Sequence, residues 1–100
     1  MKYGLSTESI EEICNVLSKY PEVQEAIIYG SRARGDYRQG SDIDLTLKGM
    51  SLNLSTLTRI ENEIDDLLLP YEMDLSSFEA LSDANLISNI EKQGKVLYSR

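Results

Sequence analysis

The sequence predicts an α/β (α+β) fold in which helices pack against a mixed sheet of about four strands. Amphipathic helical segments alternate with short strand segments along the chain, in the order α-β-α-β-α-β-α-β. Proline and glycine punctuate the boundaries between these segments. The chain has 100 residues, of which 41% are hydrophobic and 27% charged, as in ordinary globular proteins. We expect one domain over residues 1–100, because this length supports a single modest core.

The first helix is expected over residues 6–19, where apolar side chains recur at helical spacing at Ile10, Ile13, Cys14 and Leu17. Ser6 or Ser9 is expected to cap it, and Pro21 to end it. Residues 23–29 are expected to form a central strand, because residues 26–29 are continuously apolar. This strand runs directly into Gly30-Ser31 and the sequence SRAR, a pattern that predicts a strand-to-helix turn whose free N–H groups can face an anion.

Residues 42–47 alternate strictly and predict a half-buried strand with an acidic face. A second long helix is expected over residues 55–69, with Ser55 as its N-cap, Pro70 as its end and a buried stripe of Leu57, Ile60, Ile64, Leu67 and Leu68. A third strand is expected over residues 71–78. On it, one face carries Glu72, Asp74 and Ser76.

The last helix is expected over residues 82–92, with Ser82 as its cap and Gly94 in the position that follows a helix end. A short strand over residues 95–98 is expected at an edge of the sheet. Together with the earlier segments, these elements complete the predicted mixed sheet.

The charge balance restricts the classes of function. A net charge of −7 argues against direct binding of nucleic acid, whose phosphates attract clustered Lys and Arg. A local basic loop on an acidic protein suits a small polyphosphate better, and three of the ten basic residues lie close together at Arg32, Arg34 and Arg38. No apolar run approaches the ~20 residues of a membrane span. With one cysteine and no signal pattern, we expect a cytoplasmic protein without membrane contact. The absence of histidine excludes histidine-based zinc sites and histidine general bases.

The chemistry is expected between Tyr29 and Thr46. There Gly30-Ser31 is followed, after ten residues, by Asp42-x-Asp44 at the start of the alternating strand. Carboxylates at i and i+2 of a strand point to the same face, and Mg²⁺ takes oxygen ligands of this kind together with substrate phosphates. Each piece alone is explained by a turn or by a surface acid. Their joint spacing, with Asp74 on a later strand, predicts a phosphoryl- or nucleotidyl-transfer site.

This spacing resembles the signature of the DNA polymerase β-like nucleotidyltransferases. The short length, the run GSRARGDY and the closing GKVLY resemble the minimal nucleotidyltransferases (MNT), antitoxins of HEPN-domain toxins. The resemblance implies a nucleotidyltransferase fold that binds ATP with Mg²⁺ and transfers AMP to a tyrosine of a HEPN ribonuclease toxin. By motif, it assigns the triphosphate to Gly30, Ser31 and Arg32, and the metal and catalysis to Asp42, Asp44 and Asp74. Glu72 is an alternative third carboxylate, on the same predicted face.

The resemblance also implies a hetero-oligomer with the toxin, whose basic surface an acidic antitoxin would attract. Two other functions remain open at this point. A non-catalytic module could neutralise the toxin by contact alone. An enzyme of the same chemistry could instead modify a small molecule, although 100 residues leave little room for a separate acceptor pocket.

Overall fold

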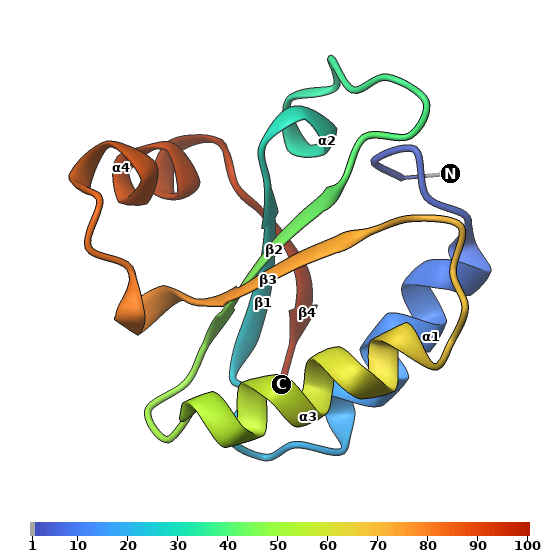
Figure 1. Cartoon of the computed structure of the whole chain (residues 1–100). Coiled ribbons are helices and arrows are strands. Elements are labelled where there is room, and N and C mark those ends of the chain that lie inside the picture. Colours follow the sequence, from blue (N-terminus) through green and yellow to red (C-terminus); the bar gives the residue numbers. More distant parts are fainter. Residues whose placement is uncertain (1) are drawn as a thin grey trace.

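The computed structural model describes residues 2–100 as helices on the two faces of one four-stranded sheet (Figure 1). The elements follow the chain as α1 (Thr7–Ser18), β1 (Glu25–Tyr29), α2 (Ser31–Arg34), β2 (Ile43–Lys48), α3 (Leu54–Asp65), β3 (Met73–Ser77), the 3₁₀ turn η1 (Phe78–Ala80), α4 (Ala84–Gln93) and β4 (Lys95–Ser99). The predicted alternation of helices and strands is confirmed. None of the helices in residues 2–100 is long and apolar enough to cross a bilayer.

The strand order is β3-β2-β1-β4. β1 pairs antiparallel with both β2 and β4, whereas β2 and β3 are parallel and are joined by the crossover helix α3. The sheet is therefore mixed, as predicted. β1 is central and β4 lies at an edge, as the sequence indicated, and β3 forms the opposite edge.

The core lies between the sheet and the helices α1 and α3, which lie side by side on one face (Figure 1). Its fully buried members include Ile13, Leu17, Ile28, Ile43, Leu45, Leu47 and Ile60. On the other face, α4 covers β1: a Cβ on Gly94 would meet Ile27 Cγ2 at 2.6 Å and the Ile90 carbonyl oxygen at 2.4 Å. Gly94 follows the helix as predicted, but its backbone is extended (φ −65°, ψ 151°) rather than left-handed. Close packing, not a left-handed cap, therefore explains this glycine.

The helix ends differ from prediction in identifiable ways. Ser6 caps α1, one of the two predicted alternatives. Asn53, not Ser55, caps α3, because its Oδ1 accepts the Thr56 N–H at 2.8 Å. Asp83, not Ser82, caps α4 through the N–H groups of Asn85 and Leu86. In both cases the prediction chose a serine near an equally good capping side chain.

The second long helix is also shorter than predicted. α3 ends at Asp65 rather than at residue 69, before Pro70 can act. The chain then turns through Leu68, which has a left-handed φ of +55°. Leu68 is 87% exposed, so its assignment to the buried stripe was wrong. Periodicity alone does not show where a helix stops.

Candidate functional site

Two carboxylates lie next to each other on the face of the sheet opposite the main core. In β2, the side chains of Ile43, Leu45 and Leu47 enter the core, so Asp44 points to the other face. The register of the parallel pair places Asp74 of β3 directly beside Asp44. Neighbouring strands are ~4.8 Å apart, which brings both side chains within reach of one ion. Asp42, exposed, precedes β2 by one residue.

Asp44 is affected both by its own burial and by the charges of the other two acids. Partial burial raises the pKa of Asp44, the charges of Asp74 and Asp42 raise it further, and Arg34 opposes them. Among residues 2–100, however, no three Asp, Glu, His or Cys side chains are already gathered closely enough to hold a metal ion. The backbone places the acids together, and their side chains would have to turn to converge on one ion. We refer to Asp42, Asp44 and Asp74 as the acidic triad.

Glu72 does not join this group. It lies outside β3 and borders a different hollow, together with Glu61 and Asp65 of α3. Glu72 is also absent from the charges that act on Asp44. Of the two alternatives for a third carboxylate, the register therefore favours Asp74.

The raised pKa of Asp44 has a consequence for stability. A carboxylate whose pKa is higher in the folded chain than its ordinary value of 3.8 binds a proton more tightly when folded. The stability that this proton provides is present below that value and is lost as pH rises through the raised pKa. We therefore expect Asp44→Asn to stabilise the metal-free chain relative to wild type at neutral pH, and the difference to shrink as pH falls toward 3.8. Urea unfolding of both chains across this pH range measures the difference; a difference independent of pH would contradict a raised pKa of Asp44.

Gly30 allows the backbone to approach the acidic triad closely. Its φ of +76° lies in the region that favours glycine, and it forms the N-cap of α2. A Cβ at this position would lie 2.4 Å from Asp44 Oδ2. Ser31 follows as the first residue of α2, where backbone N–H groups lack partners within the helix. The structure thus places Gly30, one of the two predicted triphosphate contacts, against Asp44, and Ser31 follows it in the chain.

This geometry predicts two separate costs for Gly30→Ala. Essentially only glycine adopts the backbone conformation at this position (φ +76°, ψ −153°), so alanine should cost about 1–3 kcal/mol of stability, and the new methyl group should also push Asp44 aside. Gly35→Ala is the matched control, because Gly35 has a φ of +91° and, within residues 2–100, a Cβ there would meet nothing within 4 Å beyond its chain neighbours. We expect Gly30→Ala to lose at least as much stability as Gly35→Ala in urea unfolding, and only Gly30→Ala to lose Mg²⁺-dependent activity as well. Equal activity losses would exclude the contact with Asp44.

Arg32 is placed differently from what its predicted phosphate contact requires. Its side chain is only 3% exposed. The guanidinium donates two hydrogen bonds to the Ser41 carbonyl oxygen, at 3.1 and 2.7 Å, and one to the Tyr3 carbonyl oxygen, at 2.9 Å. It also packs against the rings of Tyr37 and Tyr71, at 5.2 and 5.0 Å from their centroids. These contacts give Arg32 a positioning role for the segment before Asp42, and direct contact with phosphate stays a prediction.

Two further residues were not singled out from the sequence. Tyr29 lies opposite Asp44 in the β1–β2 register. Burial raises its pKa, as do the charges of Asp74 and Asp44, while a hydrogen bond with Ser76 opposes the shift. Arg34 is exposed and close enough to Asp44 to lower its pKa. The sequence showed Arg34 only as part of a basic run, and Tyr29 only as the end of an apolar strand.

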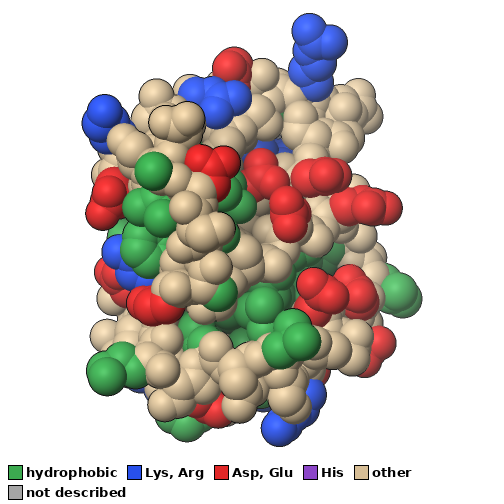
Figure 2. All heavy atoms as spheres, turned by 60° about the vertical axis from the view of Figure 1, so that its left-hand side comes forward, with side chains coloured by type: hydrophobic (Ala, Val, Ile, Leu, Met, Phe, Trp, Pro, Cys, Tyr) green, Lys and Arg blue, Asp and Glu red, His purple; other side chains and the backbone are tan. Residues whose placement is uncertain are grey.

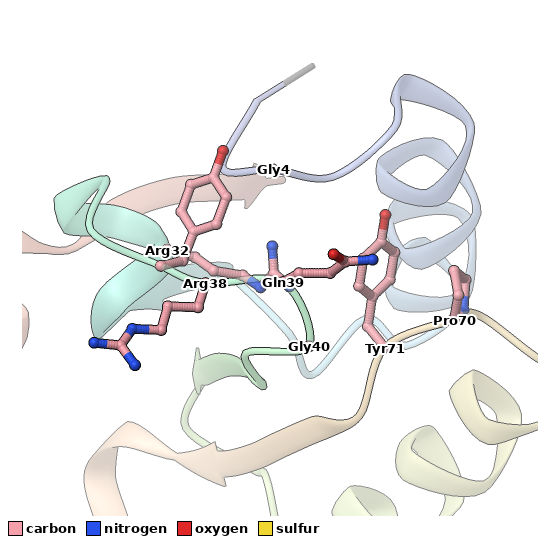
Figure 3. A pocket seen from close by; sticks show the side chains of 8 residues that line it. Gly4, Arg32, Arg38, Gln39, Gly40, Pro70 and Tyr71 are labelled. Atoms are coloured by element: carbon pink, nitrogen blue, oxygen red, sulfur yellow. The ribbon is translucent and has the colours of Figure 1, made fainter.

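A hollow of about 440 Å³ lies beside Arg32, whose side chain forms part of its wall (Figure 3). Tyr71 and Pro70 stand at one end of it and Arg38 at the other. The loop residues Gln39 and Gly40 complete its wall, and the acidic triad does not line it. The hollow and the acidic triad therefore share no lining residue.

Residues 11–100 match the family model described as "Polymerase beta, Nucleotidyltransferase". The chain belongs to this family. Its fold is that of the nucleotidyltransferases, which confirms the predicted architecture. A comparison with curated proteins finds no match.

Solved structures share the nucleotidyltransferase fold. A chain from a toxin–antitoxin complex with AMP-PNP has a TM-score of 0.74 and 22% identity, over 91% of this chain and 73% of that chain. A chain from the complex of a tri-AMPylated Shewanella oneidensis HEPN toxin with MNT antitoxin has a TM-score of 0.71 and 19% identity, over 96% and 74%. A structure described as a minimal nucleotidyltransferase has a TM-score of 0.73 and 21% identity, over 95% of each chain. At these identities, the likeness shows the fold.

Proposed function

We propose that this nucleotidyltransferase transfers AMP from ATP to a tyrosine hydroxyl of a HEPN ribonuclease toxin and thereby acts as its antitoxin. The observation that carries the proposal is the register of β2 and β3, which sets Asp44 beside Asp74 and next to Gly30. The likeness to chains from a complex with AMP-PNP and from one with an AMPylated toxin supports the nucleotide and the acceptor.

The donor set of the site fits Mg²⁺, which prefers carboxylate oxygens and usually retains substrate phosphates among its ligands. The raised pKa of Asp44 is consistent with this fit, because burial and the charges of Asp74 and Asp42 both disfavour its anionic form and a divalent cation would offset them. When bound, Mg²⁺ would neutralise charge on the phosphate oxygens. Asp42, Asp44 and Asp74 would hold it in place.

The roles of the other site residues in the transfer follow from their positions in the fold. Gly30 and Ser31 would hold the triphosphate against the acidic triad. The acceptor oxygen forms a new bond to the α-phosphorus, the bond from that phosphorus to pyrophosphate breaks, and pyrophosphate leaves. The hydroxyl proton passes to a base, for which Asp74 is our candidate because it lies at the sheet edge and is exposed. Such a transfer depends mainly on positioning and on charge stabilisation.

The test is transfer to the toxin itself. The purified chain is incubated with ATP, Mg²⁺ and a co-expressed HEPN protein, and the intact mass of each protein is measured. We expect AMP-sized increments on the HEPN protein, located on tyrosine by peptide sequencing. Increments that are absent, or that persist after Asp42→Asn and Asp44→Asn together, would exclude the proposed reaction.

A cell experiment distinguishes catalysis from the alternative, in which the chain neutralises the toxin by binding alone. A pure binding protein gains nothing from adjacent carboxylates that repel each other, and this repulsion favours the enzyme. If the chain with Asp42→Asn protected cells from the toxin as well as wild type, contact alone would explain the antitoxin effect. Loss of protection with retained complex formation would support catalysis.

A further inference from the structure

Within residues 2–100, no strand pairs with the outer edge of β3. The Ile43 N–H donates a hydrogen bond to the Glu72 carbonyl oxygen. In a parallel ladder, every second residue directs both its N–H and its C=O to the same neighbouring strand, so Glu72 and every second residue after it direct these groups toward β2. The N–H and C=O groups of Met73 and Leu75 therefore point away from the sheet. Among the hydrogen bonds of residues 2–100 outside the ladders, none reaches these groups. Figure 1 shows β3 in front of the other strands, with α3 below it.

The surface beside this edge carries an exposed leucine at each end, and the end at Leu54 is apolar. Leu54 at the start of α3 is 78% exposed, and Leu68 just beyond its end is 87% exposed. Next to Leu54 lies a hollow of about 310 Å³ that is also lined by Leu57, Leu75 and Leu81. Exposed apolar side chains that border a hollow are typical of protein-binding surfaces. We call the strip between β3 and α3 the β3–α3 groove.

The opposite end of the β3–α3 groove is acidic. A second hollow there, of about 440 Å³, is lined by Glu61, Asp65 and Glu72, together with Tyr71 and Met73. In the part of the chain that the structure describes, no lysine or arginine lines this hollow. In Figure 2, acidic side chains gather over one part of this side of the molecule, next to a strip of hydrophobic side chains. A segment bound along the groove would be matched by a basic residue at one end and an apolar residue at the other.

We propose that the β3 edge binds an extended, basic segment of the acceptor protein as an added strand. Backbone hydrogen bonds to Met73 and Leu75 would hold the segment, and alternate side chains would enter the groove beside Leu54. The other side chains would lie on the face of Asp74, next to Asp44. A hydroxyl side chain at that position would stand beside the acidic triad. This last step and the identity of the partner as the acceptor protein rest on the proposed function; the docking of an extended, basic segment does not.

The probe is a capped peptide, Lys-Lys-Val-Tyr-Val-Thr-Leu, added to the full chain without ATP. We expect the amide hydrogens of Met73 and Leu75 to exchange freely in the isolated chain and to become protected when the peptide binds, as measured by NMR. The same result is expected with Asp44→Asn, so a failure of catalysis cannot be mistaken for a failure of docking. Protection elsewhere, with these two amides unchanged, would overturn the proposal.

Two isomers of the peptide test the backbone contact. One carries N-methyl groups on both valines and the other on tyrosine and threonine, so the methyl groups face opposite sides of an extended chain. An added strand loses affinity with one isomer and keeps it with the other. Equal affinity for both, or loss with both, would contradict strand addition. Protection of Met73 and Leu75 in the chain alone, rising with its concentration, would show that a second copy occupies the edge and would also overturn the proposal.

A matched pair of variants tests the groove. We expect Leu54→Ser to weaken peptide binding about tenfold, because an exposed leucine that is buried on binding loses its contact. Met50→Ser is the control: Met50 is 99% exposed but borders a different hollow, with Pro21 and Glu22. Neither residue belongs to the core, so both variants should fold. Equal affinity of the two variants would exclude the groove.

Discussion

Replacing Asp44 with asparagine is expected to abolish transfer of AMP and to leave the fold intact. Asp44 is the member of the acidic triad that its neighbours constrain most, with Asp74 beside it in register and Gly30 against its carboxylate. An amide in its place cannot supply a second anionic oxygen to a metal. Metal ions contribute several kcal/mol to charge stabilisation, and each 1.4 kcal/mol is tenfold in rate. We therefore expect activity to fall by about 10³-fold in a radiolabelled ATP assay.

The same variant should lose the stabilising effect of magnesium. In wild type, Mg²⁺ should raise the unfolding temperature, since it binds the folded chain only and relieves repulsion at Asp44. In Asp44→Asn the rise should be small. Asp66→Asn, at the exposed end of α3, is the control and should behave as wild type. If Asp44→Asn kept both its activity and its response to Mg²⁺, the acidic triad would not be the metal site.

Replacing Arg32 with methionine is expected to cost about 3 kcal/mol of stability or more. The guanidinium donates three hydrogen bonds to the Ser41 and Tyr3 carbonyl oxygens in a site that is 3% exposed. A hydrogen bond to a charged group contributes about 1.5–3 kcal/mol, and the buried acceptors would be left without partners. In a domain of this size, the unfolding temperature should fall by about 12 °C or more. Differential scanning calorimetry measures it.

Two controls separate this positioning role from the predicted phosphate contact. Arg32→Lys keeps the charge but cannot reproduce the planar fork, so it should lose much of the same stability. Arg38→Met changes an exposed arginine of the loop that follows α2 and should change stability by less than about 0.5 kcal/mol. An unchanged unfolding temperature for Arg32→Met, with a raised KM for ATP, would instead show that Arg32 acts on the triphosphate.

Much of the architecture could be predicted from local patterns. The alternation in residues 42–47 predicted that Ile43, Leu45 and Leu47 face the side of the strand opposite to Asp44. The structure buries these three apolar side chains. The apolar run before Gly30 indicated a central strand, and β1 is central. These predictions succeed because side-chain direction in a strand follows from covalent geometry alone. Helix ends were less predictable, since Asn53 and Asp83 competed with nearby serines as caps.

The same division, between what the local sequence predicts and what the fold decides, applies to the candidate site. The sequence by itself determined the motif, because Gly30, Ser31, Asp42 and Asp44 lie in one short stretch whose spacing is visible in one dimension. Tertiary structure decided the rest. Asp74 was preferred to Glu72 by the register of two parallel strands, which no local pattern specifies. Arg32 reads as a loop cation in sequence, yet it is buried because Tyr3, Ser41 and the rings of Tyr37 and Tyr71 meet around it from distant parts of the chain. Contacts between residues far apart in sequence form only when the chain closes on itself, so the role of such a side chain becomes visible only in the fold.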